Sequence, residues 1–360
     1  MKIYLLGYFG SGAYADDLIG EITRRMLQDA WTAAERPGQL TIHDRTTHAC
    51  PAAGPDVAKF LNEYDLVVFC GGSLLGRLRL PPFHRVETWI ERLAVPLVLL
   101  GTGWRREDLP LSREEIDRMQ LLLGHAQAVY VRGEMTRQQI LDHRLPAERV
   151  RVLGDPGLCF EPPTPRGPAP EKMRVGVVVR QMSDVEINQD RATLDNETWH
   201  IRLAEILEAL IAAGHEIVFC PMTPEWRKHD NDHLGTDAVR RNMRSREPIE
   251  VLESSIWTLP PHLATFDLVV SQRLHGTLIS LSQGVPVFPI EYQFAKMADS
   301  LSLPGFERIH QLITPQRRVD VPRFFAKLPM LLDPSLQSDT QAACDVVRAE
   351  YRGVIAGLLR

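Results

Sequence analysis

The sequence predicts an α/β protein with two open domains, each built on a parallel β-sheet. Three observations lead to this fold class. Short apolar segments of strand length alternate with helical apolar patterns, and glycine-containing turns directly follow several of the strands. A segment dense in proline divides the chain into halves of similar size. A chain of 360 residues is also long for a single core and suits two domains.

The composition is typical of a soluble globular protein, with 44% hydrophobic and 24% charged residues. The formal net charge of −5 gives no support to nucleic-acid binding, which favours a basic surface. The apolar run at the N-terminus is too short for a signal peptide, and no later run is long enough to span a bilayer. These features predict a cytoplasmic protein.

The five cysteines predict reduced thiols, which agrees with a cytoplasmic location. They are widely scattered and form no C-x-x-C pair, so neither a disulfide framework nor a structural zinc site is indicated. They are Cys50, Cys70, Cys159, Cys220 and Cys344.

The first half begins as a strand, a glycine-rich loop and a helix. Ile3 to Leu6 is the expected strand, Gly7 to Gly12 the loop, and the helix is expected to begin at Asp17. The glycines do not match G-x-G-x-x-G, so the loop gives only weak support to a dinucleotide site. Two interpretations stay open for Asp16 and Asp17: helix capping at the positive end of the dipole, or a catalytic role.

Two further strands of the first half end in glycine turns. The strand over 65–70 precedes Gly71 and Gly72, and the strand over 96–100 precedes Gly101-Thr102-Gly103. Glycines in such turns let backbone N–H groups approach an anionic or hydroxylated ligand, and they also simply permit a tight turn.

The rest of the first domain, which we expect to end at residue 161, continues the alternation. Ser112 and Glu115 predict a capping box before a helix, and a strand over 128–131 leads to Arg132. Asp155 follows the last strand of this half and is expected to be structural.

Residues 162–171 form the predicted linker, because their proline density excludes a helix or a central strand. The second domain is expected over 172–335, followed by a C-terminal helix over 336–360. The helical pattern from Thr340 to Leu359 is expected to pack back on the first domain.

The second half restarts the α/β rhythm with strands over 174–179 and 216–220 and a helix over 199–213. Arg180 ends the first of these strands, where it forms either a surface ion pair or a ligand contact. The cluster from His229 to His233 has no zinc-site spacing, so we expect a solvated loop or a helix N-cap there and no metal site.

The most specific pattern lies between Leu263 and Leu301. A strand over 266–270 is followed at once by a helical pattern from Leu274, and Gly284-Val285-Pro286 stops that helix before a strand over 287–290. The segment therefore predicts a βαβ unit. In such sheets ligands bind at the carboxyl ends of the strands, and a helix N-terminus favours an anion.

Three residues at this crossover are candidates for ligand binding. Arg273 supplies a fixed charge, His275 a titratable nitrogen, and Gly276 room for a ligand to approach. The alternative is an ordinary helix start, in which Arg273 pairs with a carboxylate and His275 bonds to a backbone carbonyl.

The stretch resembles the C-terminal signature of the polysaccharide pyruvyl transferase family. In that signature an Arg-(Leu or similar)-His motif follows an apolar strand, and a Gly-Val-Pro strand follows the helix. Arg273-Leu274-His275 and Gly284-Val285-Pro286 match it. Arg180 also falls where the family has an arginine after the first strand of its C-terminal domain.

The resemblance extends into the N-terminal half with three departures. Asp16 and Asp17 match the end of the family's glycine-rich segment, but Ala13 and Ala15 replace its Asn and Gly. Glu134 replaces the Asp of a Val-Arg-Asp motif.

The resemblance implies two Rossmann-like parallel-sheet domains that face a cleft in a glycosyltransferase-B-like arrangement. The first domain would bind the acceptor and the second the donor. The implied activity transfers the pyruvyl group of phosphoenolpyruvate to a sugar, forms a cyclic ketal across two hydroxyls and releases phosphate. Phosphoenolpyruvate is then a donor substrate, and no cofactor or metal is expected.

The resemblance also assigns roles to individual residues. His275 and Arg273 would be catalytic. The implied substrate-binding residues are Arg180, Leu274, Gly276, Asp16, Asp17, Gly71, Gly72 and Arg132.

The implied acceptor is a glycan of a cell-surface polysaccharide or exopolysaccharide. A lipid-linked acceptor would bring the cytoplasmic protein to the inner face of the membrane. Two alternatives stay open: a glycosyltransferase of the same architecture that uses a nucleotide sugar, and a non-catalytic glycan-binding homologue.

Overall fold

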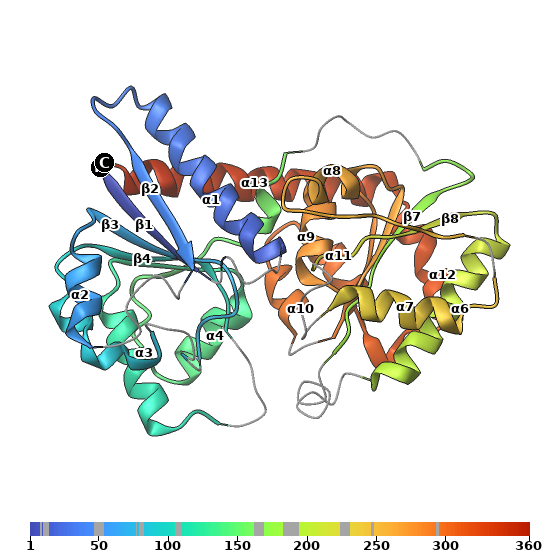
Figure 1. Cartoon of the computed structure of the whole chain (residues 1–360), viewed down its shortest axis with the longest axis horizontal. Helices are drawn as coiled ribbons and strands as arrows, with labels where there is room; N and C mark the ends of the chain where they lie inside the picture. The colour runs from blue at the N-terminus through green and yellow to red at the C-terminus, as the bar shows by residue number, and fades with distance from the viewer. Residues whose placement is uncertain are drawn as a thin grey trace. The chain divides into compact units, whose positions relative to one another are not determined.

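The chain folds into two compact units in a computed structural model (Figure 1). Unit 1 comprises Met1–Ser11, Asp16–Pro156 and Val346–Arg360, and unit 2 comprises Gly12–Ala15 and Gly157–Asp345. The structure describes residues 1–7, 9, 14–46, 54–76, 78, 83–104, 110–161, 169–182, 194–223, 231–245, 248–292 and 295–360. Most of the predicted linker lies outside these residues, so the linker stays a prediction.

Unit 1 contains a six-stranded parallel sheet in the order β2-β1-β3-β4-β5-β6. The order reverses between β1 and β3, which makes that pair the topological switch point. The strands are β1 (Lys2–Gly7), β2 (Thr41–Thr46), β3 (Leu66–Cys70), β4 (Leu97–Thr102), β5 (Ala128–Val131) and β6 (Val150–Val152).

Helices cover both faces of this sheet, with α1 on one face and α2, α3 and α4 on the other (Figure 1). The helix bounds are α1 (Tyr14–Ala33), α2 (Pro55–Leu61), α3 (Arg113–His125) and α4 (Glu134–Asp142), with short 3₁₀ turns η2 (Phe83–Thr88) and η3 (Ile90–Arg92). The predicted capping box is confirmed, because Ser112 and Glu115 exchange both hydrogen bonds at the start of α3. The prediction for α1 was wrong by a few residues, since this helix begins at Tyr14 rather than Asp17.

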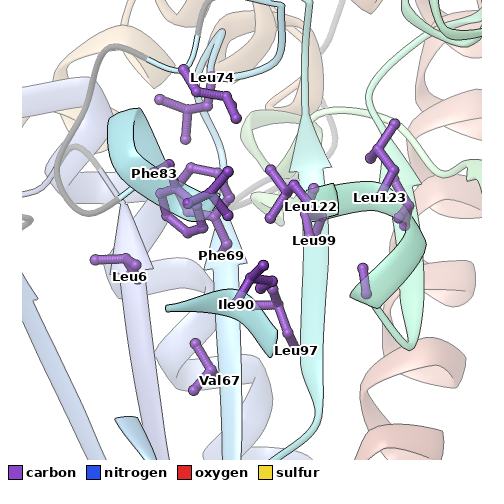
Figure 2. Close-up of a cluster of buried hydrophobic side chains, with 14 of the residues drawn as sticks. Leu6, Val67, Phe69, Leu74, Phe83, Ile90, Leu97, Leu99, Leu122 and Leu123 are labelled. Atoms are coloured by element: carbon purple, nitrogen blue, oxygen red, sulfur yellow. The ribbon is translucent and has the colours of Figure 1, made fainter. Parts of the chain in front are cut away.

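The core of unit 1 is formed where side chains from β1, β3 and β4 meet those of η2, η3 and α3 (Figure 2). Phe69 and Phe83 stack with their ring centroids 4.0 Å apart, and Leu99 lies beside Leu122 (Figure 2). All of β3 is buried, as expected for a parallel strand with helices on both faces. This burial explains why the apolar pattern predicts the strand so well.

Unit 2 contains a second six-stranded parallel sheet, in the order β12-β11-β10-β7-β8-β9. Numbered within the unit, this is the Rossmann order 3-2-1-4-5-6, and its switch point lies between β7 and β10. The strands are β7 (Arg174–Val178), β8 (Glu216–Phe219), β9 (Glu250–Val251), β10 (Leu268–Ser271), β11 (Val287–Glu291) and β12 (Thr314–Pro315). The predicted fold class, two parallel α/β domains, is confirmed.

The helices of unit 2 connect these strands and follow them to the C-terminus. They are α6 (Asn196–Ala212), α7 (Asp232–Asn242), α8 (Leu259–Ala264), α9 (Leu274–Ser282), α10 (Lys296–Ser300), α11 (Glu307–Leu312), α12 (Val321–Leu331) and α13 (Pro334–Leu358), with 3₁₀ turns η4 (Pro156–Cys159) and η5 (Gln316–Arg318). The part of α13 from Val346 onward belongs to unit 1. Among the described residues, no helix is both long and apolar enough to cross a bilayer.

The end of α13 packs on unit 1, as its helical pattern suggests. Tyr351 is fully buried, and its hydroxyl donates a hydrogen bond of 2.9 Å to the backbone oxygen of Gly154. Gly101, with φ of +64°, lies against the same hydroxyl. A side chain at position 101 would therefore collide with Tyr351 as well as strain the backbone.

Candidate functional site

The switch point of unit 2 brings two predicted site segments together. β7 and β10 are neighbours, with Ser271 opposite Val178, so the residues that follow them leave the same edge of the sheet side by side. The backbone N–H of Arg180 donates to Oε1 of Gln272 over 2.9 Å. The backbone N–H of Gln272 in turn donates to the carbonyl of Val178 over 2.9 Å. Arg180 and Arg273 are thereby anchored to adjacent strand ends.

Arg273 forms an ion pair with a buried carboxylate. Its Nε lies 3.1 Å from Oδ1 and 3.3 Å from Oδ2 of Asp232, and its Nη2 also donates to Oδ1. The Asp232 side chain is 0% exposed, whereas that of Arg273 is 13% exposed. The pair is therefore closed on the carboxylate side and reachable on the guanidinium side.

Asp232 is itself held by the loop that leaves β8. The backbone N–H of Met222 donates to its Oδ2 over 2.8 Å, and its own N–H donates to the hydroxyl of Thr223 over 2.9 Å. Burial raises the pKa of the nearby Cys220 thiol to about 12.

The structure decides between the two interpretations of the His229 to His233 cluster. Asn231 is the N-cap of α7, since its side chain accepts from the N–H of His233 over 2.9 Å, and this confirms the N-cap interpretation. Asp232, the first residue of α7, is completely buried. His229 and Asp230 lie outside the described residues. In the part of the chain that the structure describes, no three His, Cys, Asp or Glu side chains are grouped to hold a metal ion.

Arg180 is held by an aromatic ring. Its guanidinium carbon lies 5.0 Å from the ring centroid of Tyr292, the residue that follows β11. Both residues are buried, with Arg180 only 6% exposed. A cation over an aromatic face is attracted by the ring quadrupole, so Tyr292 helps to hold the guanidinium in place.

His275 occupies the first turn of α9, where Arg273 is the N-cap residue. The first N–H groups of a helix have no partner within the helix and carry the positive end of its dipole. His275 is partly exposed, whereas Leu274 is buried in the core. A Cβ at Gly276 would lie 2.7 Å from Oγ of Ser271 and 3.1 Å from Sδ of Met222, so the turn requires glycine here.

Buried polar side chains of α6 lie behind Gln272, at the carboxyl ends of β7 and β10. Nε1 of Trp199 donates to the same Oε1 of Gln272 that accepts from Arg180, over 3.0 Å. Among the described residues, Nε2 of Gln272 has no hydrogen-bond partner. Burial, helped by the charge of Arg241, lowers the pKa of His200 to about 4, so this imidazole is neutral near pH 7.

The predicted site residues of unit 1 follow the carboxyl ends of β1, β3 and β5. Gly71 and Gly72 follow β3, both with φ of +69°, and the N–H of Gly103 donates to the carbonyl of Gly72 over 2.8 Å. Arg132 is only 1% exposed, and its guanidinium packs against Gly103. Asp16 and Asp17 lie in the first turn of α1, where negative charge suits the helix dipole.

Sequence reasoning missed Asp232, Gln272 and Tyr292 as partners of the arginines. Asp232 had one usable signal: it is an acidic residue shortly after a strand of the same parallel sheet as Arg273. For Gln272 and Tyr292 the sequence gives no signal other than their positions next to the ends of strands.

Two Rossmann-like units, each built on a six-stranded parallel sheet with a switch point, define a two-domain α/β protein. The chain belongs to the polysaccharide pyruvyl transferase family, whose model matches residues 16–293. The match contains Asp16, Arg180, Arg273 and His275. The family is one of transferases that act on glycans, and this chain is an enzyme of that class.

Solved structures with the same fold include two proteins that hold a UDP-sugar. Anabaena Alr3699/HepE in complex with UDP-glucose is 14% identical, with a TM-score of 0.56 and coverage of 100% of this chain and 99% of that one. The UDP-GlcNAc 2-epimerase of Neisseria meningitidis bound to UDP-GlcNAc is 11% identical, with a TM-score of 0.55 and the same coverage. The glycotransferase of kitacinnamycin is 13% identical, with a TM-score of 0.51 and coverage of 99% and 98%. At these identities the likeness establishes the fold alone. A search of curated proteins finds no match.

Proposed function

We propose that this enzyme transfers the pyruvyl group of phosphoenolpyruvate to a sugar of a cell-surface or exopolysaccharide glycan, forming a cyclic ketal. The observation that carries the proposal is the place of the family's Arg-Leu-His motif, Arg273-Leu274-His275. It lies at the switch point of unit 2, beside Arg180 and at the N-terminus of α9. Two guanidinium groups and a helix N-terminus suit a small donor with a carboxylate and a phosphate.

The two arginines have separate parts in this proposal. Arg273 binds the phosphate, because its guanidinium is partly exposed beside the first turn of α9. Arg180, held over Tyr292, binds the carboxylate. Their planar forks can each bind two oxygens of an anion at once. Leu274 and Gly276 shape the floor of the donor site.

His275 moves the protons of the reaction. In the first step His275 donates a proton to the methylene carbon of phosphoenolpyruvate, which becomes methyl, and takes up the proton of the first sugar hydroxyl as that oxygen bonds to the central carbon. In the second step the oxygen of the second hydroxyl bonds to the same carbon while the bond from this carbon to the phosphate oxygen breaks, and His275 passes the proton of the second hydroxyl to the departing phosphate. Phosphate leaves, and the atoms balance without a redox step. Imidazole is suited to both proton transfers near neutral pH.

The acceptor glycan contacts unit 1 in this proposal. Its hydroxyl groups bind Asp16, Asp17 and the backbone of Gly71 and Gly72. The guanidinium of Arg132 packs against Gly103, in the turn that is hydrogen-bonded to Gly72. The reaction uses no cofactor or metal. We place it in the cytoplasm, and a lipid-linked acceptor would hold the enzyme at the inner face of the membrane.

A second candidate is transfer of a sugar from a nucleotide sugar. The Rossmann strand order of unit 2 and the ligands named for the structural neighbours favour it. The two candidates differ in the donor, so a test of donor use separates them.

The test is mass spectrometry of candidate glycans after incubation with the enzyme and phosphoenolpyruvate. The proposal expects acceptors that gain a pyruvyl ketal, with phosphate released in equal amount. A gain of a hexose from UDP-glucose, with no product from phosphoenolpyruvate, would instead establish the second candidate.

A further inference from the structure

The carboxylate of Asp232 is completely buried, whereas the guanidinium of Arg273 that it binds is partly exposed at the candidate site. We propose that Asp232 is a positioning residue, which fixes the orientation of the Arg273 guanidinium. The negative charge of Asp232 also weakens the electrostatic attraction between Arg273 and the anionic donor. The inference rests on the proposed function only in that Arg273 contacts the anion of the donor.

The geometry leaves the Asp232 carboxylate a single orientation. One oxygen accepts from the backbone N–H of Met222 over 2.8 Å, and both oxygens accept from Arg273. The backbone of Asp232 is tied to Thr223 and to the start of α7. The exit loop of β8, the N-terminus of α7 and the crossover after β10 therefore meet at one carboxylate, which holds the plane of the guanidinium.

Other ion pairs of unit 2 contrast with this one. Arg174 pairs with Glu216 and Glu250, and Arg308 pairs with Asp333 and Asp339. Each of these carboxylates is more than a third exposed, so solvent screens the pairs and they contribute little to stability. Burying a carboxylate completely is costly, and an apolar pair of the same shape is often at least as stable. Because the buried charge of Asp232 is not needed for stability, we infer that it acts on Arg273 at the candidate site.

The charge of Asp232 has two opposing effects on an anionic donor. It neutralises Arg273 and repels the approaching anion, which lowers affinity. It also holds the guanidinium in one orientation, which favours the reactive placement of the donor. Removing the charge while keeping the shape should therefore tighten anion binding and slow turnover at the same time. Loss of a structural pair alone would not tighten binding.

The experiment is calorimetric titration of the full-length protein with inorganic phosphate, beside turnover with phosphoenolpyruvate. Asp232→Asn keeps the acceptor for Met222 N–H and removes the charge. It should bind phosphate about tenfold more tightly than the wild type and turn over about tenfold or more slowly. Asp232→Glu keeps the charge but shifts the carboxylate, so it should bind phosphate as the wild type does and still lose turnover. The matched control is Asp339→Asn, which removes an exposed partner of Arg308 and should change neither quantity.

Four results would overturn the inference: unchanged or weaker phosphate binding by Asp232→Asn, equal tightening by Asp339→Asn, full turnover by Asp232→Glu, or no phosphate binding by the wild type. Should Asp232→Asn fail to fold, the Asp232→Glu measurement decides. Failure of the proposed function is a separate outcome, because the wild type would then not turn over phosphoenolpyruvate. The phosphate titrations would still test the role of Asp232.

Discussion

Arg180 and Arg273 are immobilised by different partners, although they follow neighbouring strands of one sheet. Arg180 lies over the ring of Tyr292, and Arg273 is paired with the carboxylate of Asp232. Both contacts use the flat shape of the guanidinium. A lysine at either position would keep the charge and lose the planar contact, so Arg→Lys is not a conservative change here.

His275 is the residue whose removal should separate chemistry from folding. It is partly exposed in the first turn of α9, so His275→Ala should leave the protein folded. Turnover with phosphoenolpyruvate should fall by roughly 10²–10⁴-fold, the usual contribution of a positioned acid or base. The measurement is the rate of phosphate release, with thermal unfolding as the check on folding.

His310→Ala is a suitable control, because His310 is also a partly exposed helical histidine, in the last turn of α11. It should keep full activity. Full activity of the folded His275→Ala variant would mean that His275 is only a helix-start residue.

Residue partners were the hardest feature to predict from the sequence. Asp232 and Arg273 are separated by 41 residues, and they meet because β8, β7 and β10 are consecutive in the sheet. No local pattern encodes that strand order. The sequence therefore identifies Arg273 as a candidate, and only the fold supplies the carboxylate that holds it.

Whole elements were predicted well where their apolar pattern is complete. β10 and its neighbour β7 are almost wholly buried, so their strands, and the βαβ unit that carries Arg273, can be located from sequence. β9 and β12 have two residues each, too few to show a pattern. β2 has the mainly polar sequence TIHDRT and lies at the sheet edge, so its apolar signal is weak.

The contact between α13 and unit 1 gives a prediction at the scale of an element. Tyr351→Phe removes the hydroxyl that donates to the Gly154 carbonyl and leaves a buried acceptor unsatisfied. The free energy of unfolding should fall by about 1–3 kcal/mol, measured by urea denaturation. Tyr130→Phe, at a half-buried position of β5, is the control and should cost less. Equal stability of Tyr351→Phe and wild type would show that this hydrogen bond does not anchor the helix.

At the scale of the whole molecule, the two units share one plan. Each has a six-stranded parallel sheet with an internal switch point, and the candidate residues follow the strands at that point, except for Arg132, which follows β5. The alternation of strands and helices was enough to predict this plan. The family's motif then indicated which strand ends carry candidate site residues, but the partners of the arginines depend on the folded sheets.

The central claim is that one small anion, phosphoenolpyruvate, is held jointly by Arg180 and Arg273. Calorimetric titration of the wild type with phosphoenolpyruvate and with UDP-glucose tests it most directly, with the variants Arg180→Ala and Arg273→Lys beside it. We predict that phosphoenolpyruvate binds and raises the unfolding temperature, because a ligand of the folded state stabilises it by mass action. Each variant should weaken this binding, and the double variant should lose little more than the worse single one, since both residues hold the same ligand. Tight binding of UDP-glucose, with neither heat nor a thermal shift from phosphoenolpyruvate even when an acceptor glycan is present, would contradict the claim.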